Sequence, residues 1–342
     1  MSAERAGADA GRQLKTWLEA LGAARTDYFM FRRNRLALCA LPDDPETFLK
    51  TLKLYRPQRP LSRAYVWVLH LGLHTGLLRR FWPRTPWHPG ADTTGPTVGI
   101  LWGNASHGDQ RCIFCFREGA RWVVGKYSTE ARPLARETEL LRAAERFPGS
   151  APRCLRLDSG PRGNILKMEY RDHTSQSPTL RQKVGLLASW LLDSPARPLA
   201  DFPAGRRLLA SPDLPASLRR EITNLWLRPT LSHGDFAPWN LLVDRGGSVF
   251  AVDWEDGEPE DAPGFDLVHD ALQREFLVHR RPFPKAQIHI REELNSTTCA
   301  DYLQACGWAS HLHLLLPFSL YLERARRPAL APWIGEMDLS GF

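Results

Sequence analysis

A short segment in the second half of the chain restricts its fold more strongly than any other part of the sequence. The tripeptide His-Gly-Asp at residues 233–235 is followed by Asn240 and, after an apolar run and a glycine pair, by Asp253. With ordinary residue frequencies, this tripeptide with an asparagine at this spacing is expected by chance only on the order of a few times per thousand sequences of this length. A second His-Gly-Asp at residues 107–109 lacks both the asparagine and the hairpin pattern.

The pattern after Asn240 predicts a β-hairpin. Two adjacent glycines at residues 246–247 suit a two-residue type I′ turn, because both positions of that turn need a positive φ. Such a turn places Asn240 directly opposite Asp253, with their Cβ atoms about 5 Å apart. An amide oxygen and a carboxylate at the end of one hairpin form a hard-oxygen site of the kind that Mg²⁺ prefers on a phosphate. Asp235, on the preceding loop, is then free to orient a hydroxyl and accept its proton.

This segment resembles the catalytic loop and metal-binding strand of the aminoglycoside phosphotransferase/choline kinase-like family, a branch of the protein-kinase-like fold. The resemblance implies that Asp235 is the catalytic carboxylate and that Asn240 and Asp253 hold Mg²⁺, as their counterparts do in protein kinases. The tripeptide His-Gly-Asp, in place of His-Arg-Asp, favours the branch that acts on small molecules.

Two further residues are implied to support this loop. The tetrapeptide at residues 264–267 resembles the family's second aspartate, so Asp266 is expected to buttress the catalytic loop, and His233 is assigned to the same structural group. The tripeptide at residues 253–255 lacks the glycine of the protein-kinase Asp-Phe-Gly motif, which disfavours an activation segment that flips.

The family also implies a lysine and a helical glutamate near the nucleotide. Lys126 ends the third strand of a predicted small sheet. In the predicted helix 132–147, Glu137 lies within the apolar stripe, whereas Glu139 points nearly opposite. A carboxylate on a buried helix face needs a cation, and Lys126 is the candidate. We therefore expect an ion pair between Lys126 and Glu137.

The remaining nucleotide-binding residues follow from the resemblance alone. The turn 104–110, which carries Gly108, occupies the place of the phosphate-covering loop. Glu169 and Tyr170 lie in the segment that would form the hinge, where backbone groups bind adenine. ATP and Mg²⁺ are the implied cofactors.

Periodicity divides the chain into parts of different composition. Short runs rich in β-branched and aromatic residues at 97–103, 111–118 and 121–128 predict antiparallel strands, and helical patterns dominate from residue 179 onward. We expect an α+β, two-lobed protein-kinase-like fold with a small antiparallel-sheet N-lobe and a larger, mostly helical C-lobe. A proline- and glycine-rich stretch at 83–96 reads as a linker. The expected parts are a mostly helical N-terminal extension at 1–95, an N-lobe at 96–170 and a C-lobe at 171–342.

The six cysteines are too sparse for a disulfide scaffold in a chain of 342 residues. Cys112 and Cys115 form a Cys-x-x-Cys, but on a strand these positions point to opposite faces, which favours buried packing over metal or redox chemistry. A reducing, cytoplasmic setting follows. The formal net charge of +7 suits the phosphates of ATP better than it indicates nucleic acid, and no nucleic-acid partner is expected.

An apolar segment at residues 64–78 allows three interpretations. Its fifteen residues fall short of the roughly 20 that span a bilayer. A buried helix is favoured, an interfacial or partner-binding helix comes second, and a membrane span third. The arginines beside it allow association with a membrane surface through residues 61–82.

The resemblance implies an ATP- and Mg²⁺-dependent phosphotransferase with an alcohol group as acceptor, acting on a small polar molecule of the sugar, aminoglycoside or amino alcohol class. Lys126, Asn240 and Asp253 are all present, and an inactive relative usually lacks at least one of them. The alternative is a nucleotide-binding scaffold or pseudokinase whose N-terminal region binds a partner or a membrane surface.

Overall fold

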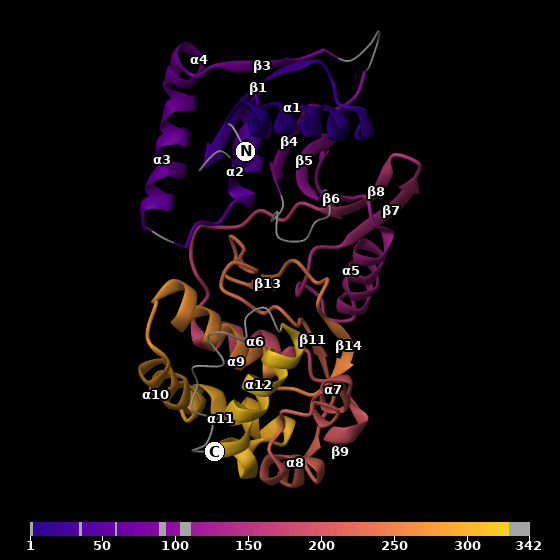
Figure 1. Ribbon diagram of the computed structural model, residues 1–342, viewed down its shortest axis with the longest axis vertical. Coiled ribbons are helices and arrows are strands. Elements are labelled where there is room, and N and C mark those ends of the chain that lie inside the picture. Colours follow the sequence, from indigo (N-terminus) through magenta and orange to yellow (C-terminus); the bar gives the residue numbers. More distant parts are fainter. Residues whose placement is uncertain (1–2, 34–35, 59, 89–93, 103–110, 328–342) are drawn as a thin grey trace. The chain divides into compact units, whose positions relative to one another are not determined.

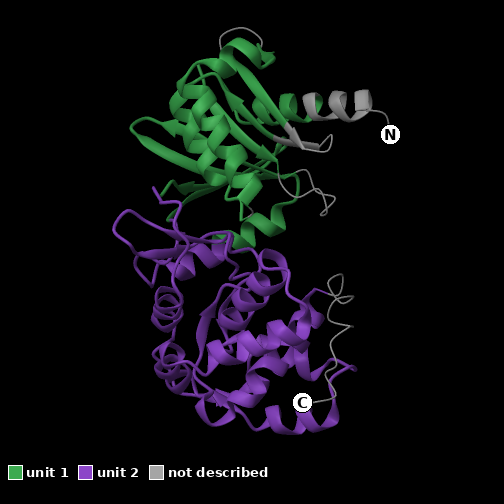
Figure 2. Cartoon of the chain, turned by 90° about the vertical axis from the view of Figure 1, so that its left-hand side faces the viewer, with its two compact units in different colours: residues 1–138, 153–171 green, residues 139–152, 172–342 purple. Residues whose placement is uncertain are grey.

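The strands predicted between residues 97 and 128 belong to one large sheet, which also includes strands from the first 95 residues. The computed structural model describes residues 3–33, 36–58, 60–88, 94–102 and 111–327 (Figure 1). The chain divides into unit 1, residues 1–138 and 153–171, and unit 2, residues 139–152 and 172–342 (Figure 2). Unit 1 holds an eight-stranded sheet, and unit 2 is mostly helical. The predicted α+β fold, with a sheet-rich part and a helical part, is therefore confirmed.

The sheet of unit 1 is antiparallel throughout and has the strand order β3-β1-β2-β4-β5-β6-β8-β7. The three strands predicted at 97–103, 111–118 and 121–128 are present as β4, β5 and β6. The strands are β1 (Thr26–Arg33), β2 (Leu36–Pro42), β3 (Arg84–Trp87), β4 (Val98–Trp102), β5 (Cys112–Glu118), β6 (Arg121–Ser128), β7 (Cys154–Gly160) and β8 (Gly163–Glu169).

The first 95 residues differ from the predicted extension. Their helices are α1 (Ala3–Ala20), α2 (Pro45–Leu54), α3 (Pro60–His74) and α4 (Leu77–Phe81), but β1, β2 and β3 also lie in this region. The stretch expected to be a linker contains β3, which pairs with β1. Strand β2 pairs with β4, so this region extends the same sheet, whose β4 edge would otherwise expose unpaired backbone groups.

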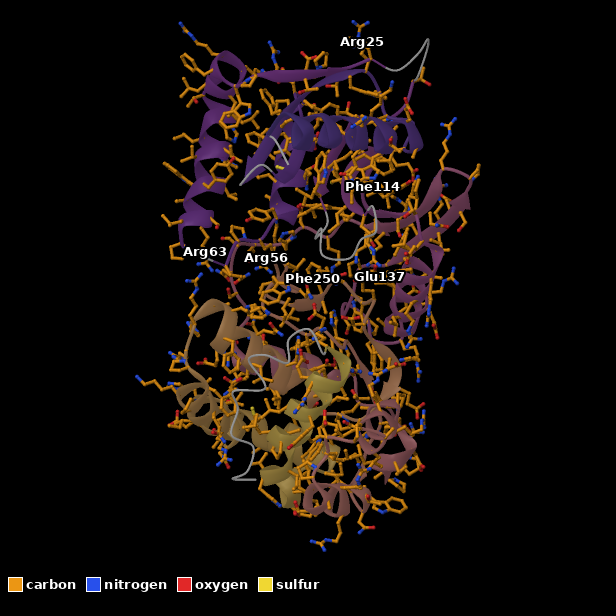
Figure 3. All side chains as sticks on the ribbon, viewed as in Figure 1. Arg25, Arg56, Arg63, Phe114, Glu137 and Phe250 are labelled. Carbon is orange, nitrogen blue, oxygen red and sulfur yellow. The ribbon has the colours of Figure 1, made fainter. Side chains whose placement is uncertain are left out.

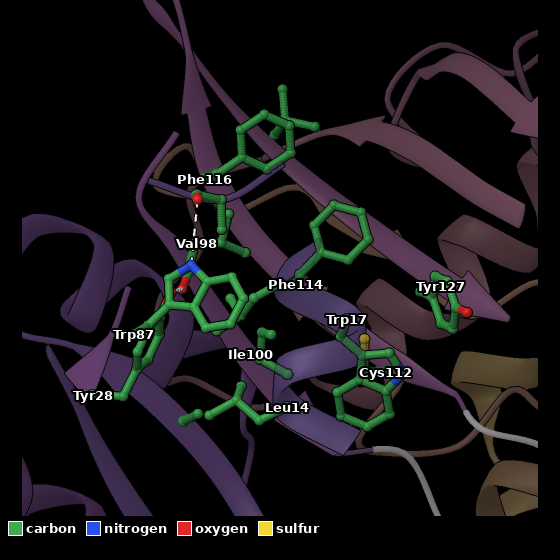
Figure 4. Packing of buried hydrophobic residues seen from close by; sticks show 14 residues of the cluster. Leu14, Trp17, Tyr28, Trp87, Val98, Ile100, Cys112, Phe114, Phe116 and Tyr127 are labelled. Atoms are coloured by element: carbon green, nitrogen blue, oxygen red, sulfur yellow. Dashed lines mark hydrogen bonds between the residues drawn. The ribbon is translucent and has the colours of Figure 1, made fainter. Parts of the chain in front are cut away.

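Successive residues of β1 face opposite sides of the sheet, as the period of two requires. Tyr28 belongs to a cluster that includes Trp17 of α1, and its hydroxyl donates to the carbonyl of Val98 at 2.8 Å (Figure 4). Phe29 belongs to a second cluster, with Phe48 of α2 and residues of α3 and α4. The sheet is thus covered by α1 on one face and by α2, α3 and α4 on the other.

Cys112 and Cys115 lie on opposite faces of β5, as predicted. Cys112 packs in the cluster with α1, whereas Cys115 interacts with Thr51 of α2. Burial raises the pKa of the Cys115 thiol to about 12. All six cysteines are free thiols.

Unit 2 contains three two-stranded sheets in addition to its helices. Strand β11 pairs with β14, β12 pairs with β13, and β9 pairs with β10. Helix α9 is buried along its whole length. Helix α5 (Ala131–Ala144) corresponds to the helix predicted at 132–147. Its first residues belong to unit 1 and its last residues to unit 2. The elements of unit 2 are α6 (Leu180–Ser189), β9 (Arg197–Pro198), α7 (Pro203–Leu209), α8 (Ala216–Thr223), β10 (Trp226–Leu227), β11 (Thr230–Ser232), β12 (Leu241–Val243), β13 (Val249–Ala251), β14 (Glu258–Asp261), α9 (Phe265–Gln273), α10 (Phe283–Leu294), α11 (Thr297–Cys306) and α12 (Leu312–Arg326).

The apolar segment predicted at residues 64–78 forms most of α3 and the start of α4. Leu69 and Leu73 of α3 are buried against the sheet's second cluster. Each helix within the described ranges is too short or too polar to cross a membrane.

Gly125 of β6 offers a test of packing in unit 1. A Cβ at this position would lie 2.1 Å from Cζ of Phe114, whose ring is fully buried. We expect Gly125→Ala to lower the free energy of unfolding by about 1–3 kcal/mol, because the ring must shift within a closely packed cluster. Urea denaturation measures the effect. Gly160→Ala, where nothing lies within 4 Å of the added atom, is the matched control and should change stability far less. Equal losses in both variants would contradict the packing argument.

Candidate active site

The predicted ion pair between Lys126 and Glu137 is present in unit 1. The Nζ of Lys126 on β6 lies 2.8 Å from Oε1 and 2.7 Å from Oε2 of Glu137 on α5. Glu137 is labelled in Figure 3. The Glu137 side chain is fully buried, and the Lys126 side chain is 14% exposed. A buried carboxylate requires such a partner, and the pair fixes the position of an ammonium group on a side chain that solvent still reaches.

The structure describes only part of the predicted nucleotide-binding segments. Gly108 lies outside the described residues. The backbone N–H of Glu169 donates to the carbonyl of Arg153 at 3.0 Å, and that of Tyr170 donates to Trp122 at 3.1 Å. These two backbone donors are therefore bonded within unit 1, and a nucleotide would have to use other backbone groups of this segment.

The predicted hairpin forms, but its register differs from the prediction by one residue. Strand β12 pairs with β13 so that Leu242 lies opposite Phe250. The N–H of Val252 donates to the carbonyl of Asn240 at 2.9 Å, so Val252, rather than Asp253, faces Asn240. The prediction that Asn240 and Asp253 lie directly opposite each other is wrong.

The turn explains the changed register. The connection has three residues, 245–247, because the N–H of Asp244 donates to the carbonyl of Ser248. The carboxylate of Asp244 accepts from the N–H groups of Gly246 and Ser248, both at 2.9 Å. An aspartate that bonds the backbone two residues ahead stabilises this longer turn, and Gly247 supplies its positive φ of 84°.

Asp253 has an unusual backbone conformation. Its φ is 70°, a left-handed value that only one other non-glycine residue, Arg280, shares within the described part of the chain. This conformation costs about 1–2 kcal/mol in an L-residue and interrupts the alternation of faces that a strand would impose. The charge of Asp253 is among those that act on the imidazole of His233, so Asp253 remains close to the loop at residues 233–240.

Asp266, in the first turn of α9, bonds the backbone of this loop. Its carboxylate accepts from the N–H of His233 at 2.8 Å and from that of Gly234 at 2.9 Å. The hydroxyl of Ser232 donates to it at 3.2 Å. Gly234 has a φ of 78°, and a Cβ there would lie 2.1 Å from the carbonyl oxygen of Asp256. Only glycine fits this position, and a single carboxylate bonds the two successive N–H groups of His233 and Gly234.

His233 is buried and neutral. Its Nε2 donates to the carbonyl of Val252 at 2.9 Å, and its Nδ1 accepts from the N–H of Asp235 at 3.3 Å, which assigns the proton to Nε2. Burial lowers the pKa of His233 in spite of the nearby carboxylates. The ring thus connects the loop to the end of the hairpin.

Asp235 is the carboxylate at the centre of the site. Its Oδ2 accepts from Nδ2 of Asn240 at 2.8 Å, and its Oδ1 contacts Nε2 of His269 at 3.0 Å and Nη2 of Arg327 at 3.1 Å. Burial alone would raise its pKa, but the hydrogen bond and charge of His269 and the charge of Arg327 outweigh burial and hold the pKa well below its usual range. The side chain is 24% exposed, so Asp235 is an ionised carboxylate that solvent reaches.

His269 is a functional candidate that the sequence reasoning missed. Its fully buried ring lies between two carboxylates, Oδ1 of Asp235 at 3.0 Å and Oε2 of Glu323 at 3.1 Å. Burial lowers its pKa, but the hydrogen bonds to both carboxylates raise it to about 9. The spacing in the sequence could have indicated this residue. His269 follows Asp266 by three positions, so on a helix the two side chains share one face and can reach the same loop.

Arg327 and Glu323 were also missed, and no local pattern connects them with the loop. They come from the end of α12 and the residue after it. Arg327 donates to the carbonyl of Gly234 at 3.2 Å, to Asp256 at 2.9 Å and to Oε1 of Glu323 at 3.0 Å. The arginine thereby links the loop, the segment after the hairpin and α12.

A second set of charges fixes α9 at Asp270. Asp270 is fully buried and accepts from Nζ of Lys183 on α6 at 2.6 Å and from Arg274 at 2.9 Å. Arg274 also bonds Glu293 of α10. Since removal of one partner from a buried charge pair is strongly destabilising, these contacts hold the helix that carries Asp266 and His269.

The residues predicted to hold a metal retain a suitable donor set. The amide nitrogen of Asn240 donates to the carbonyl and the carboxylate of Asp235 at 2.9 and 2.8 Å, which leaves its oxygen as the atom for a metal. An amide oxygen together with the Asp253 carboxylate is the hard-oxygen chemistry that Mg²⁺ prefers. Across the described ranges, no group of three or more His, Cys, Asp or Glu could hold a metal ion. A Mg²⁺ ion at Asn240 and Asp253 would take its other oxygens from water and phosphate.

The fold and the site together define a class of protein. An α+β chain carries a His-Gly-Asp loop, an asparagine and an aspartate on a hairpin, and a helix whose first aspartate holds that loop. Residues 113–269, which contain all of these features, match the family model described as the phosphotransferase enzyme family. The resemblance to the aminoglycoside phosphotransferase/choline kinase-like family is thereby confirmed for this part of the chain.

Solved structures that resemble the chain have low sequence identity to it. Choline kinase LicA from Streptococcus pneumoniae is 15% identical, with a TM-score of 0.37 over 70% of this chain and 94% of that one. An aminoglycoside-3′-phosphotransferase of type VIII is 19% identical, with a TM-score of 0.41 over 66% and 93%. A thermostable mutant of aminoglycoside phosphotransferase APH(4)-Ia, in a ternary complex with ADP and hygromycin B, is 13% identical, with a TM-score of 0.42 over 77% and 96%. No curated protein matches the sequence.

The buried ion pair between Lys126 and Glu137 can be tested by its effect on stability. We expect Lys126→Met to lower the free energy of unfolding by about 3–5 kcal/mol, because Glu137 is left charged and buried. The double variant Lys126→Met/Glu137→Met should recover most of this loss. Urea denaturation measures both. Lys15→Met breaks an exposed pair with Glu19 and should cost less than about 1 kcal/mol. A double variant less stable than Lys126→Met would contradict the argument.

His269 makes stability depend on pH. Its pKa of about 9 exceeds the unfolded value of about 6.5, so the folded chain binds the extra proton. Its contribution is complete below about pH 6.5 and is lost as pH rises through 9, a loss of up to roughly 3 kcal/mol. Denaturation midpoints between pH 6 and 9.5 should fall more steeply for the wild type than for His269→Gln. His289→Gln, on the surface, is the control and should follow the wild type. Parallel profiles for the wild type and His269→Gln would refute the prediction.

Proposed function

We propose that the chain is an ATP- and Mg²⁺-dependent phosphotransferase that transfers a phosphoryl group to a hydroxyl of a small polar molecule. The observation that carries this proposal is the state of Asp235, an ionised and partly exposed carboxylate that Asn240, His269 and Arg327 hold in one orientation. The match of residues 113–269 to the phosphotransferase family supports the same function.

Asp235 would act chiefly by position. Phosphoryl transfer passes through a loose transition state, in which alignment of the attacking oxygen matters more than its early deprotonation. A carboxylate with a pKa well below its usual range is a weak base but remains ionised, so it accepts a hydrogen bond from the acceptor hydroxyl. As the new O–P bond forms, the hydroxyl proton passes to Asp235 and the β–γ bridging oxygen of ATP keeps the electron pair of the broken P–O bond.

His269 and Arg327 would position Asp235 rather than touch the substrate. Both contact Oδ1, while Asn240 contacts Oδ2. Their positive charges lower the basicity of the carboxylate, which delays proton transfer until the attacking oxygen has become acidic. The hydrogen bonds from the N–H groups of residues 233 and 234 to Asp266 fix the backbone that immediately precedes Asp235.

Nucleotide contacts are proposed for residues that lie far apart in the sequence. Asn240 and Asp253 would hold Mg²⁺, which neutralises charge on the transferred phosphate when it is bound. Lys126, oriented by Glu137, would contact the phosphates of ATP. Further nucleotide contacts are proposed for Gly108, Glu169 and Tyr170 from the resemblance alone. The acceptor belongs to the sugar, aminoglycoside or amino alcohol class that the family resemblance implies.

The test measures product with purified protein, ATP, Mg²⁺ and a panel of acceptors that includes choline, ethanolamine, glucosamine, kanamycin and hygromycin B. Phosphorylated product is identified by mass spectrometry. We expect Asp235→Asn to reduce kcat by roughly 10²- to 10⁴-fold, because the amide cannot accept the hydroxyl proton. EDTA should abolish turnover.

Asp193→Asn, at a fully exposed carboxylate remote in sequence from the site, is the matched control and should retain wild-type turnover. The alternative of a nucleotide-binding scaffold makes a different prediction, in which ATP binds, no acceptor is phosphorylated, and Asp235→Asn behaves like the wild type. That outcome would contradict the proposed function.

A further inference from the structure

The basic character of the chain comes from a single stretch. Residues 47–91 contain no aspartate or glutamate, although they include eight of the chain's 45 lysines and arginines. The rest of the chain is therefore close to neutral, and the net charge of +7 is a local property. The eight basic residues are Lys50, Lys53, Arg56, Arg59, Arg63, Arg79, Arg80 and Arg84.

The same stretch carries most of the large apolar side chains that are exposed in the described ranges. Ten large apolar side chains are exposed in the described ranges, and seven of them lie between residues 61 and 82. The seven, which we term the α3–α4 face, are Leu61 (87% exposed), Trp67 (64%), Val68 (55%), Leu71 (44%), Leu77 (50%), Phe81 (72%) and Trp82 (36%). Exposed side chains gathered in this way mark an interaction site more often than scattered ones do.

Helix α3 is apolar on two sides. Leu69 and Leu73, four residues apart, are buried against unit 1. Residues 61, 64, 68 and 71 recur at intervals of three and four, so they form a second stripe that faces away from the buried one. A helix that is apolar all round is normally covered on every side. Within the described part of unit 1, the side chains of this outer stripe are exposed.

Arginines stand at both ends of the apolar stripe. Arg63 lies in the first turn of α3 (Figure 3), and Arg80 lies in α4 with its guanidinium 5.5 Å from the centre of the Phe81 ring. Neither forms an ion pair with a carboxylate within the described ranges. Arg79 and Arg84 differ, because both bond Asp43. The Nε of Arg63 donates to the carbonyl of Pro57 at 3.2 Å, which leaves its charge without a neutralising carboxylate. The charges of Arg63 and Arg80 can therefore attract an anionic partner.

We propose that the α3–α4 face docks onto the surface of a bilayer that contains anionic lipids. The 15 residues of α3 span only about 22 Å at 1.5 Å per residue, which fits a helix lying in the plane of the interface. Trp67 and Phe81 are residue types found on the apolar face of helices that lie in a bilayer interface. Arg63 and Arg80 attract the negative surface, and residues 47–91 carry no acidic side chain that would repel it. Asp43, which bonds Arg79 of α4, is neutralised by Arg79 and Arg84. This proposal does not depend on phosphotransferase activity.

The test is flotation of the full chain with vesicles of phosphatidylcholine alone or of phosphatidylcholine with phosphatidylglycerol, at low and high salt. We expect binding to the anionic vesicles, weaker binding at high salt, and little binding to neutral ones. Trp67→Ser/Phe81→Ser should weaken binding by at least about tenfold. Arg63→Gln/Arg80→Gln should weaken it by roughly 25-fold, about fivefold for each arginine.

Matched controls come from exposed residues of unit 2. Trp226→Ser/Ile288→Ser removes equally exposed apolar groups, and Arg207→Gln/Arg220→Gln removes two exposed arginines. Both should bind the vesicles like the wild type. Unchanged melting temperatures of all four variants show that they are folded. Equal binding by the test and control variants would overturn the proposal. Concentration-dependent self-association that Trp67→Ser/Phe81→Ser abolishes, without vesicle binding by the wild type, would assign the face to a second copy and also overturn it.

Discussion

The geometry of the candidate site depends on the carboxylate of Asp266. Backbone N–H groups in a buried loop need acceptors, and one carboxylate satisfies those of His233 and Gly234 at once with charge-assisted bonds. Gly234 has a conformation that only glycine adopts readily, so the loop would not hold this shape without a strong partner. Because Asp266 lies at the start of a fully buried helix, its hydrogen bonds hold the loop against a fixed part of the structure.

The charges around α9 form a balanced set. His269 is a buried cation between two carboxylates, and Asp270 is a buried carboxylate between two cations, one residue further along. Each unpaired charge would carry a large desolvation cost, so the members of each set depend on one another. The consequence for chemistry is that Asp235 stays ionised although it is mostly buried, and its orientation follows from α9 and α12 together.

Particular residues show how far the sequence reasoning reached. Lys126 and Glu137 were found because strand and helix periodicities place each side chain on a face, and a buried carboxylate demands a cation. The hairpin was predicted, but its register was wrong because the Asp244 carboxylate bonds the backbone of the turn and favours a three-residue connection. In the sequence, the adjacent glycines indicate a two-residue turn more strongly than Asp244 indicates the longer one. Strands β1 and β2 were missed because the first 95 residues were predicted to be mostly helical, although Phe29 and Phe31 of β1 alternate. Strand β3 was missed because the proline-rich stretch suggested a linker.

The sequence by itself determined the local features of this protein: its strands and helices of strong period, its cysteine placement on β5, and a motif whose spacing defines the candidate site. Only the tertiary structure showed which distant residues meet it. Arg327 lies 92 positions after Asp235, and no periodicity connects residues so far apart. The same holds for the α3–α4 face, because residues 64–78 are apolar enough for burial on all sides, and only packing shows which side the sheet covers. Local patterns constrain local geometry, whereas the choice of partner depends on how whole elements pack.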